Sequence, residues 1–324
     1  MGKSKKSAGG PQKKSSLRNW ISDFFGRAGI HILIAVTFVS GLAILIRGSQ
    51  LYVSRDLAWP SRPLKVVLKN RPVWMSDSLA EQIMKSVAPM GLHSAFDHQL
   101  LVDTAKALQS NAWVRQVNQV RRVYEDKPGD TLEIDCDFRA PVALVKWGQY
   151  FWLVDGDAVK LPEQFTMQQL PKILFGPDGH INVRIIEGVA HSPTESGRVW
   201  PGTDLSGGLE LAKLLAGRDC AEEIRTIDVS NFNARRAPLE AQIVLGTKYG
   251  TQVRWGRPPS DPNAFIEVPA SVKLANMQSI FDQKKRIDAG QAWVDLRFDR
   301  VTIPSPAAAD KAASETRSAS ADGQ

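Results

Sequence analysis

The fold of this chain is decided by residues 108–159, LQSNAWVRQVNQVRRVYEDKPGDTLEIDCDFRAPVALVKWGQYFWLVDGDAV. In the middle of this stretch, apolar and acidic side chains alternate over Leu132–Phe138, which is typical of a half-buried β-strand with an acidic outer face. The residues just before it, Glu125–Asp130, include a proline and a glycine and predict a tight turn. A second β run, Tyr150–Val154, ends at a further turn, Asp155–Asp157. The stretch therefore predicts strands separated by polar turns.

The residues upstream add a strand and two helices to these strands. Leu64–Leu68 reads as a first strand. A helix follows from Ser76 or Asp77 to about residue 88, and a second helix covers about 97–109, each with apolar side chains along one face. Over residues 62–138 the predicted order is therefore strand, helix, helix, strand, strand.

The chain downstream, residues 139–303, is rich in strands. Glu240–Leu245 and Thr251–Trp255 flank a glycine-containing turn and predict a β-hairpin. Leu209–Ala216 and Val272–Phe281 have apolar residues at helical spacing. We therefore predict an α+β fold with two domains, the second of which contains two helices in addition to its strands.

The motifs at the junction of the two domains resemble those of the FtsQ/DivIB family of bacterial cell-division proteins. The resemblance rests on Asn111–Val114, the basic and alternating strands, Arg139–Ala143 and the following aromatic strand with its Asp-Gly turn. Near the C-terminus, Trp293–Asp299 is similar to the family's aromatic-Val-Asp-Leu-Arg-aromatic-Asp segment. Two positions depart from the pattern: Tyr124 follows the basic strand in place of Trp-Pro, and Lys69–Pro72 stands where a glycine is usual. The chain thus resembles a divergent member, and the resemblance implies a POTRA domain at 62–138 and the family's β domain after it.

An apolar segment, Ile30–Ile46, carries no charged residue. A helix needs roughly 20 residues to cross the bilayer core, with about 17 at the lower limit. We predict a single transmembrane helix at 29–47, between a disordered arm at 1–28 and a linker at 48–61. The alternatives are a cleaved signal peptide and a buried core helix, but no Ala-x-Ala-like cleavage site closes the segment and no amphipathic stripe is visible.

The basic charge of the chain is concentrated in its N-terminal arm. Of the net charge of +7, residues 1–28 supply seven Lys and Arg against one acid, Asp23, which gives +6. A nucleic-acid-binding protein would carry its basic patch on a folded domain, so we expect no nucleic-acid partner. The arm instead favours an N-terminus in the cytoplasm, with the bulk of the chain on the other side of the membrane. The resemblance implies that this membrane is the inner membrane of a bacterium and that the bulk of the chain lies in the periplasm. Residues 304–324, rich in Ala and Ser, are predicted to be a disordered tail.

No pattern of catalytic or metal-binding residues is found in the sequence. The close histidine pair, His93 and His98, has a spacing that does not place both on one helical face, and no Walker loop or dinucleotide fingerprint occurs. Gly202–Gly208 lacks the Gly-x-Ser-x-Gly register and is predicted to cap the following helix. We therefore expect no enzyme activity, metal, cofactor or small-molecule substrate. Of the two cysteines, Cys136 is predicted to be a buried free thiol rather than bridged to Cys220.

The C-terminal segment is the predicted partner site. Apolar residues alternate with polar ones over Ala292–Phe298, so one face can pack on the preceding helix. As the last strand of the sheet, it is expected at an edge, where unpaired backbone groups accept an added strand. In the FtsQ family this region receives a strand from a small coiled-coil protein, FtsB, which associates with FtsL; the alternative is that the strand only completes the core. The predicted partner-binding residues are Trp293, Asp295, Arg297, Phe298, Arg300 and Val301.

The resemblance implies a non-catalytic scaffold of the cell-division machinery, the divisome, that recruits partners through its POTRA domain and its C-terminal edge. The partners would be membrane proteins of the FtsB and FtsL type, with septal peptidoglycan synthases as further candidates. A second hypothesis is a membrane-anchored POTRA-type chaperone for secreted or outer-membrane proteins, which tandem POTRA repeats or a C-terminal barrel would favour. A third, a cell-wall hydrolase, is disfavoured because the sequence contains no nucleophile or metal set.

Overall fold

The structure is a computed structural model that describes six ranges of the chain, with side chains from Gly29 onward: 15–52, 64–94, 97–123, 130–174, 183–261 and 266–304. The described residues form two compact units. The first holds the N-terminal helix, Leu64 and Lys65, with Pro89–Leu100 and Arg122–Leu132; the second holds Val66–Ala88, Leu101–Arg121 and the residues from Glu133 onward.

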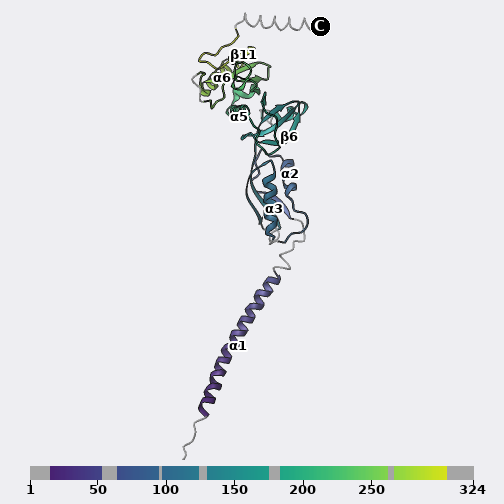
Figure 1. Cartoon of the computed structure of the whole chain (residues 1–324), viewed down its shortest axis with the longest axis vertical. Helices are drawn as coiled ribbons and strands as arrows, with labels where there is room; N and C mark the ends of the chain where they lie inside the picture. Colours follow the sequence, from purple (N-terminus) through teal and green to yellow (C-terminus); the bar gives the residue numbers. More distant parts are fainter. Residues whose placement is uncertain are drawn as a thin grey trace, which may run out of the picture. The chain divides into compact units, whose positions relative to one another are not determined.

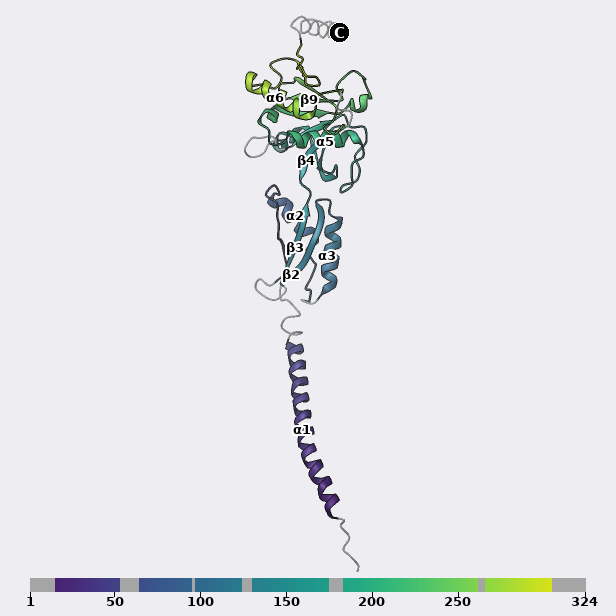
Figure 2. The ribbon, with the colours of Figure 1, turned by 90° about the vertical axis from the view of Figure 1, so that its left-hand side faces the viewer.

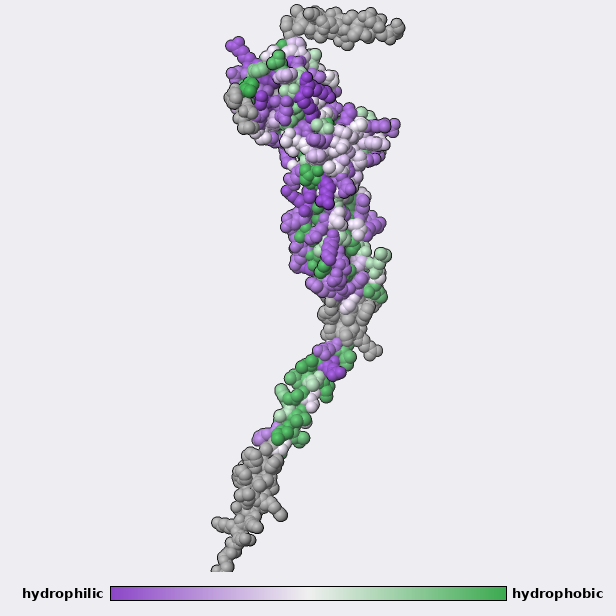
Figure 3. Space-filling view, in the orientation of Figure 1, coloured by the Kyte–Doolittle hydropathy of each residue, from purple (hydrophilic) through white to green (hydrophobic). Residues whose placement is uncertain are grey.

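The first unit contains a long helix, α1, Ser15–Tyr52 (Figure 1). Its part Gly29–Tyr52 is long and apolar enough to cross a membrane, and none of it is buried within the protein. Figure 3 shows apolar surface along this part of the helix. The hydroxyl of Thr37 donates to the carbonyl oxygens of Leu33 and Ile34, each at 2.9 Å, so this polar group is satisfied inside the helix. These features are consistent with a single membrane span or a signal anchor.

The helix is longer at both ends than the predicted 29–47. It begins at Ser15, inside the arm predicted to be disordered, and it ends at Tyr52, inside the predicted linker. The prediction averaged the composition of the whole arm, whereas residues 15–28 contain no proline and include several apolar side chains. Once a helix has formed, each added residue gains one hydrogen bond, so it extends until a strong breaker is met. The rest of the predicted arm and linker and nearly all of the predicted tail, at 1–14, 53–63 and 305–324, lies outside the described residues.

A strand, two helices and two strands follow, in the predicted order. The sheet has the strand order β1-β3-β2. Figure 2 shows its strands β2 and β3 together with the helices α2 and α3. The N–H of Lys65 donates to the carbonyl of Asp130 and the N–H of Lys69 to that of Ile134, so β1 and β3 run in the same direction. Of the predicted turn before β3, only Asp130 lies within the described residues. The bounds are β1 Lys65–Leu68, α2 Asp77–Val87, α3 His98–Ser110, β2 Val114–Val123 and β3 Thr131–Phe138.

The alternation predicted for β3 sorts its side chains between a core and a polar surface. Ile134 and Cys136 are buried in one core with Leu79 of α2 and Leu108 of α3. On the other face, the carboxylate of Asp135 accepts hydrogen bonds from neighbouring polar side chains. Burial raises the pKa of the Cys136 thiol to about 11. The prediction of a buried free thiol is confirmed, and Cys220 is buried and unpaired too.

The second sheet has eight strands in the order β11-β10-β9-β8-β7-β4-β5-β6. β7 runs parallel to both β4 and β8, β11 runs parallel to β10, and the other pairs are antiparallel. The predicted hairpin is confirmed as β9 and β10. The bounds are β4 Pro141–Trp147, β5 Tyr150–Asp155, β6 Lys160–Thr166, β7 Arg184–Glu187, β8 Ile224–Asp228, β9 Ile243–Thr247, β10 Gln252–Gly256 and β11 Trp293–Asp295.

Two long helices accompany this sheet: α5, Thr203–Leu215, and α6, Ala270–Lys284. A short α4, Pro171–Leu174, and 3-10 turns at Met167–Gln169, Asp219–Glu223 and Phe232–Ala234 complete the elements.

The predicted cap of this helix is confirmed at Gly202, but α5 begins at Thr203 rather than at the predicted Leu209, so Gly207 and Gly208 lie inside the helix. The glycines serve packing instead. A Cβ atom at Gly207 would lie 2.7 Å from the ring of Phe232, and one at Gly208 would lie 3.1 Å from Ile186. Glycine therefore lets α5 approach its neighbours closely.

A larger side chain at Gly207 is expected to destabilise the protein. Gly207→Leu should lower the free energy of unfolding by about 1–3 kcal/mol, because overpacking displaces neighbouring side chains. The matched control is Ser206→Leu, at an exposed position of the same helix, which should change stability by no more than about 0.5 kcal/mol. Urea denaturation followed by tryptophan fluorescence measures both. Equal stabilities for the two variants would contradict the packing role of Gly207.

Candidate functional site

The predicted partner site lies at one end of the eight-stranded sheet. β11 pairs with β10 in parallel, with Val294 opposite Val253. The pairing extends past β11, because the N–H of Leu296 donates to the carbonyl of Arg254 at 3.1 Å. Val294 and Leu296 are buried in the core, as the alternation predicted. The structure therefore brings the predicted residues to a sheet edge.

The chain turns back after β11, which the sequence analysis missed. The N–H of Asp295 donates to the carbonyl of Thr302 at 2.8 Å, and the N–H of Thr302 donates to that of Asp295 at 3.2 Å, which makes an antiparallel bridge. The strand predicted to reach Phe298 ends at Asp295. It is the outermost strand of the sheet, as predicted, but the bridge to Thr302 covers its last residue. The outer segment at this edge is Arg300–Ile303. Its β-branched run, ending before Pro304, was the available signal for a returning strand.

Within the described residues, the outer side of the returning segment is unpaired. Both backbone groups of Thr302 face Asp295, so those of Val301 and Ile303 point to the opposite side. Neither residue has a backbone hydrogen-bond partner among the described parts of the chain. Ile303 is 48% exposed, while Val301 is half-buried and packs against the core. The segment can therefore accept one added strand without losing a bond of its own.

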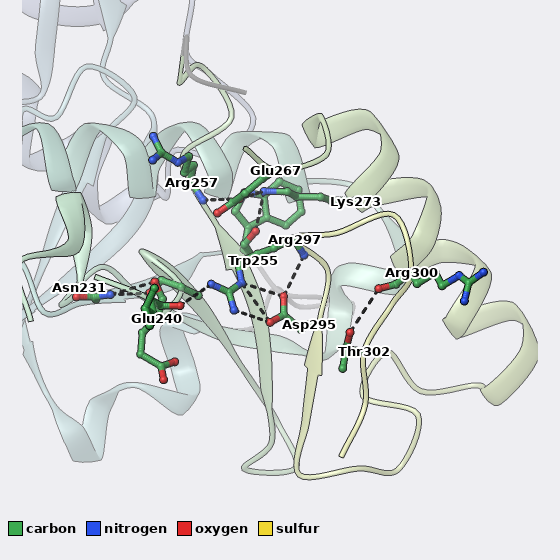
Figure 4. Close-up of polar contacts among 12 residues, drawn as sticks. Asn231, Glu240, Trp255, Arg257, Glu267, Lys273, Asp295, Arg297, Arg300 and Thr302 are labelled. Carbon is green, nitrogen blue, oxygen red and sulfur yellow. Dashed lines mark hydrogen bonds and ion pairs between the residues drawn. The ribbon is translucent and has the colours of Figure 1, made fainter. Parts of the chain in front are cut away.

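Two of the predicted partner residues, Asp295 and Arg297, form an ion pair inside the domain (Figure 4). Nη2 of Arg297 lies 2.7 Å from Oδ2 of Asp295, and its Nε donates to Oδ1 at 3.0 Å. The hydrogen bond to Asp295 raises the pKa of the Arg297 guanidinium. Arg297 also donates to the carbonyl of Leu239 at 3.0 Å. The pair fixes the turn between β11 and the returning segment.

Removal of the guanidinium from this pair is expected to destabilise the domain. Arg297→Ala should cost about 3–5 kcal/mol of folding free energy, because it leaves the buried carboxylate of Asp295 without its partner. Arg300→Ala removes an exposed arginine three residues away and should leave the stability nearly unchanged. Thermal unfolding of both variants, monitored by circular dichroism, tests this. Unfolding of Arg297→Ala at the temperature of the control would argue against the role of the pair.

A second buried ion pair holds the start of α6 against β10. Nζ of Lys273 lies 2.6 Å from Oε2 of Glu267 and donates to the carbonyl of Trp255 at 2.7 Å (Figure 4). Burial lowers the pKa of Lys273, against the opposing effect of its hydrogen bond to Glu267. Val268, which follows Glu267, donates its N–H to the carbonyl of Arg297 at 2.9 Å. The residues before α6 therefore support the segment that follows β11.

The exposed surface beside this edge is aromatic and basic. Phe298 is 48% exposed, and the guanidinium carbon of Arg297 lies 5.2 Å from its ring centre. Trp293 is half-buried, with the guanidinium of Arg254 over its ring at 4.3 Å. Arg300 is exposed. An added strand would therefore meet one aromatic ring and positive charge next to the open backbone.

Elsewhere, the predicted turn at Asp155–Asp157 is confirmed. The carboxylate of Asp155 accepts hydrogen bonds from the N–H groups of Asp157 and Val159 at 2.9 and 2.8 Å, and it pairs with Arg139 at 2.7 Å. Its oxygens thus close the turn. In the part of the chain that the structure describes, no three or more His, Cys, Asp and Glu side chains are grouped so that they could hold a metal ion.

The chain matches no protein-family model, and no curated protein is similar to it in sequence.

Proposed function

We propose that this protein is a bitopic scaffold of the bacterial cell-division machinery, of the FtsQ/DivIB type. In this proposal α1 spans the cytoplasmic membrane, with the basic arm in the cytoplasm. Residues 62–138 act as a POTRA domain and residues 139–303 as the β domain, both in the periplasm. The order of elements supports the proposal, since an apolar helix precedes a β-α-α-β-β module and a mixed sheet. The observation that carries it is the open backbone edge at Val301 and Ile303, next to exposed Phe298.

The proposed mode of action is β-strand addition. A segment of a small coiled-coil membrane protein of the FtsB type, together with FtsL, would pair with the outward N–H and C=O groups of Val301 and Ile303. Main-chain hydrogen bonds then supply affinity, and alternate side chains supply specificity. Phe298 would serve as the aromatic anchor of the interface. Septal peptidoglycan synthases are further candidate partners, and the protein itself contributes no catalysis.

The first test concerns topology. Because seven basic residues precede the apolar part of α1, the N-terminus is expected in the cytoplasm. A phosphatase that is active only outside the cytoplasm, fused after Gln324, should therefore be active. The matched control is the same fusion of a reporter that is active only inside the cytoplasm, which should be silent. The reverse pattern would overturn the orientation and, with it, the proposed function.

The second test concerns the edge. Ile303→Pro should abolish binding of the FtsB-type partner, because proline removes the outward N–H and cannot pair in a ladder. The matched control, Ile303→Ala, keeps that N–H and should retain most of the binding. Phe298→Ala should weaken binding by about 2 kcal/mol, or roughly 30-fold in Kd. The measurement is co-purification of the partner with the full-length protein in lipid nanodiscs.

Each variant needs a check of its fold, for which circular dichroism is sufficient. Phe298 and Ile303 are each about half exposed, so these changes are expected to leave the core intact. Arg300→Glu, at another exposed position, adds a test of charge. Folded Ile303→Pro, Phe298→Ala and Arg300→Glu proteins that all bind like the parent would show that this edge is not the docking site. The edge strand β2 would then be the next surface to test.

A further inference from the structure

The loop between α2 and α3 exposes two large apolar side chains. Met90 is 95% exposed and Leu92 is 50% exposed. Neither belongs to a hydrophobic core of the described residues. A single exposed apolar residue is ordinary on a protein surface, but two on the tip of one short loop make a small apolar projection.

The backbone behind this projection is held in place by polar contacts. Gly91 has a φ of +91°, a conformation that glycine adopts without strain and that lets the chain reverse between the two apolar residues. The ring of His93 bridges the carbonyl of Met90 at 3.1 Å and the carboxylate of Asp97 at 3.0 Å. Asp97 in turn accepts the N–H of Leu100 at the start of α3, at 3.2 Å. The loop therefore presents Met90 and Leu92 from a fixed base.

This loop lies at the end of the module where the chain enters from α1. β1 begins there, since Lys65 donates to the carbonyl of Asp130 at the start of β3. Nη1 of Arg122, at the end of β2, donates to the carbonyl of Ser94 in the loop at 2.7 Å. The loop, the start of β1 and the β2–β3 connection thus share one end, and they belong to the same compact unit.

The connection between α1 and this end is short. Tyr52 is the last residue of α1, and Leu64 is the next described residue. Even a fully extended chain of this length reaches only about 40 Å, at roughly 3.3–3.6 Å per residue. If α1 spans a bilayer, the start of the module is therefore held within about 40 Å of that bilayer, which raises the effective concentration of the apolar projection at the membrane surface.

We propose that Met90 and Leu92 insert into the interface of the bilayer that α1 spans, so that the module has two attachments to the membrane. The inference rests on the proposed membrane anchor. Two apolar side chains would bind lipid weakly by themselves, but the tether makes their insertion an intramolecular step. A second attachment would restrict the rotation of this end of the module relative to the membrane.

The test uses the full-length protein in vesicles of phosphatidylethanolamine and phosphatidylglycerol. Met90→Cys is labelled with a polarity-sensitive fluorophore, and quenching by nitroxide groups on the lipid acyl chains is measured. The matched control is Val73→Cys, because Val73 is also apolar and fully exposed, in the loop between the end of β1 and α2. The native cysteines are buried, and labelling of the parent protein gives their background.

A label at position 90 should shift its emission to the blue and lose most of its intensity to the lipid nitroxides, while the label at position 73 should not. Equal quenching at the two positions in a protein that floats with the vesicles would overturn this inference and leave the anchor intact. A blue shift without lipid quenching would also overturn it, because protein rather than lipid would then cover the loop. A protein that does not float with the vesicles would refute the anchor, and the inference would fall with it.

Discussion

The structure depends on the burial of both faces of β4. Ala143 and Val145 face the core beneath α5. Leu144, between them, faces the other core, which contains Ile134 of β3 and Leu108 of α3. Side chains of a strand alternate between its faces, so a continuous apolar run is required to fill two cores at once. A shift of one residue in the pairing of β4 would exchange these faces. A change of register would therefore cost a large amount of free energy.

The pattern of buried faces also explains which parts of the fold could be predicted from the sequence. Leu132–Phe138 alternates with period two because only one of its faces is buried, and the helices α2 and α3 have one apolar stripe each. Local patterns of this kind are sufficient to predict an element and its buried face. The start of α5 could not be predicted, because Gly207 and Gly208 indicate a loop locally. Their helical position is stabilised by contact with Phe232 and Ile186, which are distant in the sequence.

At the candidate site, too, some features could be predicted from the sequence and others could not. The sequence predicted the buried side chains Val294 and Leu296 and the general location of the edge. It did not predict the pairing of Asp295 with Arg297 or of Glu267 with Lys273. Such pairs depend on the geometry of turns, and charged residues two or six positions apart occur throughout any soluble domain. For this reason Asp295 and Arg297 were assigned to the surface, although both serve the interior.

The two ends of the eight-stranded sheet differ in a way that bears on function. At the β6 end, Lys160 is bonded on its outer side by Arg198 and Gly197, and Pro162 has no N–H to offer a further strand. Sheet edges are commonly protected in this manner against unwanted pairing. At the other end, the returning segment covers Asp295 but leaves a β-branched edge with two outward backbone groups at each of Val301 and Ile303. Among the described residues one end is thus protected and the other is not, as expected if the open edge is reserved for a specific partner. The buried ion pairs that hold it would then serve to fix its shape before that partner binds, which reduces the ordering cost of association.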